Sequence, residues 1–298
     1  MNWRALLPAL LLGLDAPVQA AAIYKFVDSH GVVTYTDRVT PGAKRLVFQD
    51  RMVESFSAQV RLDTRPVGKA LTFEARNDTY APVQVVLRLS GLRNAAPGGP
   101  TEVRRLVAPR SRLLLATVNP AQPGKPVTGT PGFSYVLGDP ATRTAAYRYP
   151  FPWIGGPFRI SQGPNGNFSH NGPKGRYAID IAMPEGTPII AARAGTVIKV
   201  ENDQGQGGAQ PSGNFVRVLH EDGTMGVYLH LMRGSVVVRE GEPVAQGSPL
   251  GRSGNTGHST GPHLHFVVQR NTGAGLESIP YEFDRPLQSL PNFTIGNR

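Results

Sequence analysis

Hydrophobic and polar residues alternate along much of this chain with the two-residue period of β-strands. In the middle of the chain the apolar members of this pattern are Leu71, Phe73, Ala75, Val83, Val85, Leu87 and Leu89. Turn-forming clusters interrupt the pattern at residues 77–78, 94–100 and 119–132, and no stretch has a convincing helical period. We therefore expect residues 50–150 to form an antiparallel β-sandwich-like domain.

The last half of the chain also has strand patterns. Residues 188–200 contain a bend marked by glycine, and residues 214–219 and 225–229 flank the hairpin signal Glu221-Asp222-Gly223. Residues 263–268 alternate cleanly between polar and apolar side chains. We expect residues 151–298 to form a compact antiparallel β domain, so the predicted fold class is mainly β.

The N-terminus has the pattern of a secretory signal peptide. Arg4 precedes an apolar run over residues 5–14 that is too short to span a bilayer, and Val18-Gln19-Ala20 supplies the small residues of a cleavage site. We expect cleavage of residues 1–20, after Ala20 or Ala22, with an uncleaved anchor as the less favoured alternative. The mature chain would then be periplasmic or secreted, with no transmembrane segment.

Residues 23–48 predict a small separate β module. Two β-rich runs, residues 23–27 and 32–35, flank the turn signal Asp28-Ser29-His30-Gly31. The pattern from Tyr24 to Asp37 resembles a small N-terminal module, of unknown role, that many exported proteobacterial proteins carry.

Composition narrows the chemistry. The 298 residues include no Cys, which excludes disulfides, iron–sulfur clusters, Cys-ligated zinc, a Cys nucleophile and a lipoprotein anchor. The net charge of +10 favours an anionic partner, and export makes an envelope polymer a better candidate than nucleic acid. A basic cluster on the middle domain is interpreted as a solvated strand face rather than a binding patch; it comprises Arg104, Arg105, Arg110 and Arg112.

Six of the seven histidines lie in the last domain. His263 and His265 sit two residues apart on a predicted strand, so both side chains project from one face and could serve one metal site. Asp180 lies in the short apolar strand Ile179-Asp180-Ile181, where a carboxylate needs a partner such as a metal ion, or an ion pair with Arg176 or Lys174.

The sequence motifs of other catalytic sites are absent or lack the structural context they need. His220-Glu221 has Thr224 where an H-E-x-x-H motif needs its second histidine. We expect His220, at the head of the turn formed by residues 221–223, to be an exposed turn residue. The segment 257–261 matches G-x-S-x-G around Ser259, but a strand rather than a helix is expected after it, which disfavours a nucleophile elbow. No phosphate-binding loop motif is present.

Three blocks of the sequence then resemble the LytM/lysostaphin-type zinc metalloendopeptidases of peptidoglycan. These blocks are Ala178 to Val197 (AIDIAMPEGTP, then AARAGTV), Tyr228-Leu229-His230-Leu231, and Gly251 to Phe266 (GRSGNTGHSTGPHLHF). They occur in the family's order, and the resemblance covers roughly residues 155–285. It implies a compact antiparallel β fold, one zinc ion, and hydrolysis of peptide bonds in peptidoglycan cross-links or stem peptides.

The resemblance also assigns individual residues. It implies that Asp180 and His265 bind zinc and that His230 and His263 act as catalytic groups beside the zinc-bound water. One position departs from the family, because its usual first ligand lies four residues before the Asp, where this chain has Arg176. We expect His170 to be the displaced ligand, since zinc hydrolases usually keep three protein ligands.

Two alternatives to the enzyme stay open at this point. A catalytically inactive family member would bind peptidoglycan and activate a separate amidase, and Arg176 favours that alternative mildly. A general exported binding domain would leave the His and Asp pattern without a cause. The sequence identifies no substrate-binding residues and does not fix the bond cleaved, the role of residues 23–150 or the oligomeric state.

Overall fold

The computed structural model describes residues 23–27, 33–36, 44–46, 58–208, 210–287 and 290. The chain divides into two compact units, Met1–Phe48 and Gln49–Arg298. The predicted signal peptide lies outside the described residues. No described helix is long and apolar enough to cross a membrane.

The first unit contains a three-stranded antiparallel sheet in the order β2-β1-β3. Its strands are β1 (Ile23–Val27), β2 (Val33–Thr36) and β3 (Lys44–Leu46). The first two pair as the hairpin that the sequence predicts, with Val27 opposite Val33.

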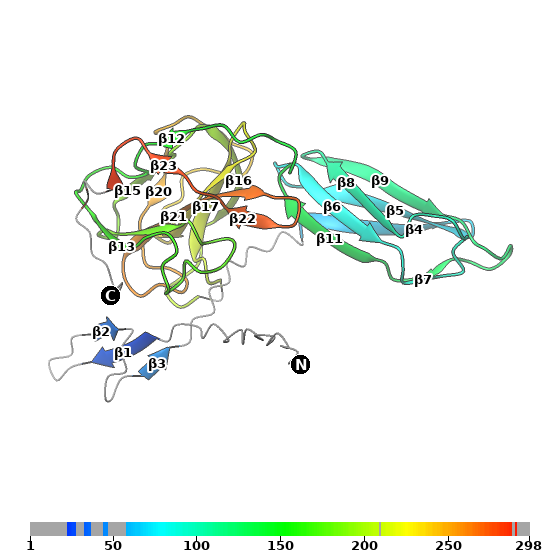
Figure 1. Cartoon of the computed structure of the whole chain (residues 1–298), viewed down its shortest axis with the longest axis horizontal. Coiled ribbons are helices and arrows are strands. Elements are labelled where there is room, and N and C mark those ends of the chain that lie inside the picture. The colour runs from blue at the N-terminus through cyan, green and yellow to red at the C-terminus, as the bar shows by residue number, and fades with distance from the viewer. Residues whose placement is uncertain are drawn as a thin grey trace, which may run out of the picture. The chain divides into compact units, whose positions relative to one another are not determined.

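The second unit begins with eight strands that form the middle domain (Figure 1). They are β4 (Val60–Val67), β5 (Ala70–Asn77), β6 (Val83–Arg88), β7 (Leu92–Arg93), β8 (Glu102–Val107), β9 (Ser111–Val118), β10 (Thr128–Gly129) and β11 (Gly132–Leu137). Two three-stranded antiparallel sheets, β4-β5-β9 and β11-β6-β8, share the buried residues Phe73, Val85 and Leu87 between them. The alternation at residues 71–75 and 83–87 thus predicts the inward faces of both sheets.

The rest of the second unit is built around one large antiparallel sheet with the path β13-β14-β21-β18-β17-β16-β19, to which β22 adds through β21. Its strands are β13 (Arg159–Gln162), β14 (Ile179–Ala182), β16 (Gly195–Glu201), β17 (Asn214–Leu219), β18 (Met225–Leu231), β19 (Pro243–Val244), β21 (His263–Asn271) and β22 (Leu276–Ser278). Two short pairs accompany it, β12 (Arg148–Tyr149) with β23 (Glu282–Phe283) and β15 (Pro188–Ile190) with β20 (Pro249–Arg252).

The described residues contain no α-helix, which confirms the mainly β prediction. One strand pair departs from the antiparallel expectation, because β12 and β23 run parallel. Each of these two strands has only two residues, and they lie far apart in sequence, so no tight hairpin joins them.

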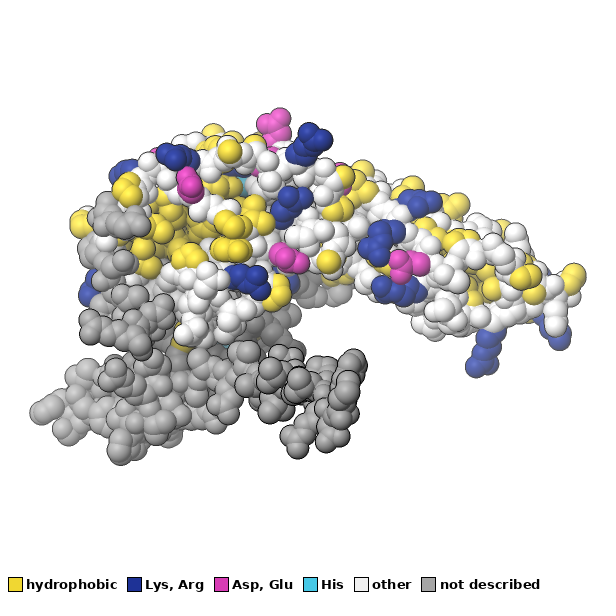
Figure 2. All heavy atoms as spheres, in the orientation of Figure 1, with side chains coloured by type: hydrophobic (Ala, Val, Ile, Leu, Met, Phe, Trp, Pro, Cys, Tyr) yellow, Lys and Arg dark blue, Asp and Glu magenta, His cyan; other side chains and the backbone are white. Residues whose placement is uncertain are grey.

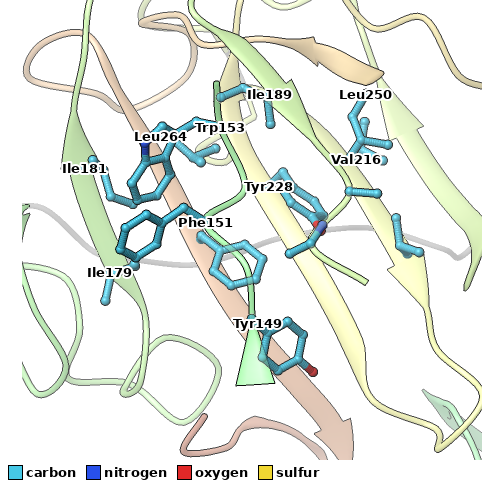
Figure 3. Close-up of a cluster of buried hydrophobic side chains, with 14 of the residues drawn as sticks. Tyr149, Phe151, Trp153, Ile179, Ile181, Ile189, Val216, Tyr228, Leu250 and Leu264 are labelled. Carbon is cyan, nitrogen blue, oxygen red and sulfur yellow. The ribbon is translucent and has the colours of Figure 1, made fainter. Parts of the chain in front are cut away.

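The main core lies on one face of the large sheet. Figure 3 shows Ile179, Ile181 and Leu264 facing Phe151 and Trp153 across this core. Phe151 and Trp153 stack with ring centroids 4.7 Å apart. Burying this face leaves the opposite side chains of β14 and β21, among them the predicted site residues, on the other face.

The arginine cluster of the middle domain is satisfied by local partners. Arg104 pairs with Glu102 at 3.0 Å, and Arg112 lies 3.8 Å from Glu74. Arg110 donates to the carbonyl of Asp78. On the face drawn in Figure 2, Lys and Arg side chains lie scattered among hydrophobic and other polar groups. This arrangement fits the interpretation as a solvated strand face.

Candidate metal centre

Strand pairing brings the predicted site residues together. In the antiparallel pair of β14 and β21, Asp180 lies opposite His265 and Ala182 lies opposite His263. Leu264 and Phe266, which alternate with the two histidines, are fully buried in the main core. His263 and His265 therefore project from the same face as Asp180.

Three of these side chains form a compact group. Asp180 Oδ1 lies 2.8 Å from His265 Nδ1 and 3.3 Å from His170 Nε2. One ligand atom from each of His170, Asp180 and His265 falls within 4.8 Å of the others, and all three residues are buried. The structure thus places His170 beside Asp180, although nine residues separate them in the chain.

His230 and His263 border this group. The His263 Nε2 atom lies 3.8 Å from Asp180 Oδ1. The His230 ring centroid is 4.7 Å from that of His263 and 6.0 Å from that of His265. All five site residues predicted from the sequence therefore share one site.

Backbone carbonyls fix the orientation of three imidazoles. The Nδ1 atoms of His170, His230 and His263 each lie 2.8 Å from a carbonyl oxygen, that of Gly163, Thr256 and Gly261 in turn. A carbonyl can only accept, so Nδ1 of each ring carries the proton. In each neutral ring the Nε2 lone pair is consequently left for a metal ion or a proton.

Burial and neighbouring charges set the protonation states. Burial lowers the pKa of His230 well below its usual value, and the nearby His263 and His265 lower it further. Burial also lowers the pKa of His263. For Asp180, burial opposes ionisation, but the charges and hydrogen bonds of His170 and His265 outweigh it and hold the pKa well below its usual range. The site therefore combines an ionised carboxylate with two neutral histidines at pH 7.

The donor set fits a metal ion. His170 Nε2 faces the Asp180 carboxylate at 3.3 Å, so one cation could contact an imidazole nitrogen and a carboxylate oxygen together. His265 Nε2 is buried and has no hydrogen-bond partner among the described residues. Two imidazoles and one carboxylate are a usual ligand set for a catalytic zinc site that keeps one open position.

Other histidines and Ser259 do not join the ligand group. Ser259 Oγ donates to the carbonyl of Gly261 at 2.9 Å and lies 3.1 Å from His263 Nδ1, on a loop with no helix after it. His258 is exposed. The expectation that His220 is an exposed turn residue is wrong, because its side chain is buried and Nδ1 donates to the carbonyl of Ala194 at 2.8 Å.

Gln162 is a site residue that the sequence patterns do not reveal. Its Nε2 donates to Asp180 Oδ2 at 3.0 Å, from the neighbouring strand β13. No motif surrounds it, and the hydrophobic pattern of Arg159–Gln162 is too short to show which way it points. Only the pairing of β13 with β14 brings it to Asp180.

Two segments of the chain match known protein families. Residues 174–275 match the model of peptidase family M23, and residues 10–70 match a domain of unknown function, DUF4124. The peptidoglycan DD-endopeptidase ShyA of Vibrio cholerae is 35% identical over 127 residues, which cover 42% of this chain and 26% of that protein. Lysostaphin of Staphylococcus staphylolyticus is 32% identical over 141 residues, which cover 44% of this chain and 25% of that protein.

A solved structure of lysostaphin from Staphylococcus simulans has 27% sequence identity and a TM-score of 0.34, and the match covers 45% of this chain and 52% of that one. The chain spans about a quarter of the length of the curated relatives named above. His170 lies just before the segment that matches the family model. The resemblance drawn from the sequence is confirmed for residues 174–275, the segment that matches peptidase family M23.

Proposed function

We propose that this chain is a zinc-dependent endopeptidase that hydrolyses peptide bonds in the cross-links or stem peptides of peptidoglycan. The observation that carries the proposal is the buried group of His170, Asp180 and His265 with two neutral histidines beside it. The relatives support the substrate, since ShyA and ShyC of Vibrio cholerae are both named peptidoglycan DD-endopeptidases.

In this proposal His170, Asp180 and His265 hold the zinc ion. Bound zinc supplies Lewis-acid chemistry that polarises a scissile carbonyl and lowers the pKa of water. Arg176, which occupies the family's usual ligand position, is exposed and would take no part. His170 would complete the set of three protein ligands.

His230 and His263 would handle the protons. Because both Nδ1 atoms are held by carbonyls, each ring can accept a proton only at Nε2. Their lowered pKa values keep both rings in the basic form at neutral pH, as a general base requires. Once protonated, the same ring can stabilise a developing oxyanion and donate to the leaving amine.

The cellular place follows from the same proposal. Peptidoglycan lies outside the cytoplasmic membrane, and the predicted signal peptide would deliver the chain there. We therefore propose a periplasmic or secreted protein whose partner is the anionic wall polymer, which agrees with a net charge of +10.

Metal analysis combined with digestion of purified peptidoglycan tests the proposal. We expect one zinc ion per chain, release of cross-linked or stem-peptide fragments, and loss of that release after chelation. Asp180→Asn and His265→Ala should each strongly weaken zinc binding and abolish hydrolysis, because each removes a ligand. A chain that binds no zinc, leaves peptidoglycan intact and stimulates a separate amidase would contradict the proposal and support the inactive alternative.

A further inference from the structure

The Gln162 side chain connects Asp180 to the turn that carries His170. At one end of its amide, Nε2 donates to Asp180 Oδ2 at 3.0 Å and to Ser169 Oγ at 2.6 Å. At the other end, Oε1 accepts the backbone N–H groups of Phe168 and Ser169, both at 3.1 Å. One side chain thus holds the carboxylate and the two residues immediately before His170.

A β-bulge aims Gln162 at this position. Ile160 of β13 pairs with Ile181, but the next paired residue is Gln162, which lies opposite Asp180, so Ser161 is the extra residue of the bulge. Gln162, Asp180 and His265 therefore form one row across three strands. Without the bulge, the strand period would turn Gln162 to the opposite face.

Gly166 leaves the space that Gln162 occupies. A Cβ atom at residue 166 would lie 2.4 Å from Cγ of Gln162 and 2.8 Å from its Cδ, too close for any side chain. The same turn holds His170 by two further bonds, since its backbone N–H donates to the Gly166 carbonyl at 3.0 Å and its Nδ1 donates to the Gly163 carbonyl.

We propose that Gln162 is a positioning residue that holds His170 and Asp180 at one metal ion. A histidine four residues before Asp180 would lie close to it through the short spacing alone. In this chain that position is Arg176, and the hydrogen bonds of Gln162 hold the more distant His170 beside Asp180 instead. The inference rests on the proposed function for the identity of the metal, and Gln162 itself contributes no ligand atom. Its effect is on metal affinity, through the geometry of two ligands.

Zinc affinity of the full chain, measured by competition with a chelator, tests this role. Gln162→Met keeps the length of the side chain and removes every hydrogen bond, so we expect affinity to fall about 10- to 100-fold. In a His170→Ala background the same substitution should cost at least threefold less, because the turn no longer carries a ligand. An equal loss in both backgrounds, or no loss, would overturn the inference.

Two further variants separate positioning from stability. Gln84 is a buried glutamine of β6 whose Oε1 accepts from Asn271 of β21 at 3.3 Å, far in the sequence from the ligand group. Gln84→Met should therefore lower the stability of the chain without changing its zinc affinity. Gly166→Ala should weaken zinc binding as Gln162→Met does, because its methyl group displaces Gln162. In a Gln162→Ala background, Gly166→Ala should have less than a twofold effect, and a full effect there would contradict the proposal.

The failure of this inference and the failure of the proposed function give different results. A parent chain that binds zinc but does not cleave peptidoglycan would contradict the proposed function alone. A Gln162→Met chain that cleaves peptidoglycan and keeps the parent's zinc affinity would contradict the positioning role alone.

Discussion

His230 has a left-handed backbone conformation, with φ of 62°, at the end of strand β18. Histidine adopts this conformation more often than most residues but still at a cost, and such strain concentrates at functional sites. The conformation is held by surrounding bonds, because the His230 N–H donates to the Ser212 carbonyl and Nδ1 donates to the Thr256 carbonyl. The fold thus holds one imidazole in a fixed orientation at the edge of the ligand group.

His230→Asn separates this backbone role from the chemical one. Asparagine is also tolerant of the left-handed region but cannot act as a base, so we expect stability and zinc affinity close to those of the parent. Hydrolysis of peptidoglycan should fall about 10²- to 10⁴-fold, the usual contribution of a general acid–base group. A variant that loses zinc instead would show that His230 is a ligand.

Among single residues, the sequence predicts the proposed metal ligands better than the side chains that surround them. The alternation at residues 263–268 is enough to place His263 and His265 on one face, because a strand leaves no other choice. It cannot place Gln162, whose position depends on a bulge in another strand. The burial of His220 is also missed, because a turn signal does not show that the imidazole is buried and donates to the Ala194 carbonyl.

The hairpin of β17 and β18 shows how one turn joins distant elements. In that turn Asp222 accepts from Thr224, from the backbone N–H of Ala145 and from Arg193, the last at 2.9 Å. Burial alone would raise its pKa, but these hydrogen bonds outweigh it and lower the pKa to about 2. The turn that the sequence predicts is therefore also an anchor for two other segments.

This anchor predicts acid sensitivity. The pKa of Asp222 is lower in the folded chain than the value of about 3.9 in an unfolded one, so its stabilisation is complete above about pH 4 and disappears as the pH falls toward 2. Asp222→Asn should cost about 2 kcal/mol at pH 7 and remove part of the loss of stability between pH 4 and 2.

Urea unfolding at several pH values measures this effect, and Asp203→Asn is the control. Asp203 pairs with Arg233 on the surface, so its substitution should change stability by less than about 0.5 kcal/mol. An equal effect of both variants would contradict the anchoring role of Asp222.

Within the second unit, the middle domain and the large sheet share one hydrophobic cluster. Met225 of β18 and Ile198 of β16 are fully buried in the same cluster as Val83 and Val85 of β6. Asn271, the last residue of β21, donates to the carbonyl of Gly138 at 2.8 Å. The sequence predicts two domains here but not their shared core, because alternation marks a buried face without naming what covers it.

A shared core predicts cooperative unfolding. Calorimetry of the full chain should show residues 58–290 unfolding in one transition rather than two. Met225→Ala should lower the temperature of that transition, since it opens a cavity worth about 2–5 kcal/mol. Val67→Ala, at a residue that is 60% exposed, should leave it unchanged. Separate transitions for the two parts, with only one shifted by Met225→Ala, would contradict a common core.

The pairing of Asp180 with His265 has a further consequence for how the protein matures. The two residues are 85 positions apart, so a metal ion held between them would act as a cross-link that closes a long loop. If the chain is exported as proposed, it would hold no complete ligand group until His265 has left the export channel and β21 has paired with β14. The metal ion would therefore bind only after β21 has paired with β14. The proposed hydrolase would have no activity during its own transport.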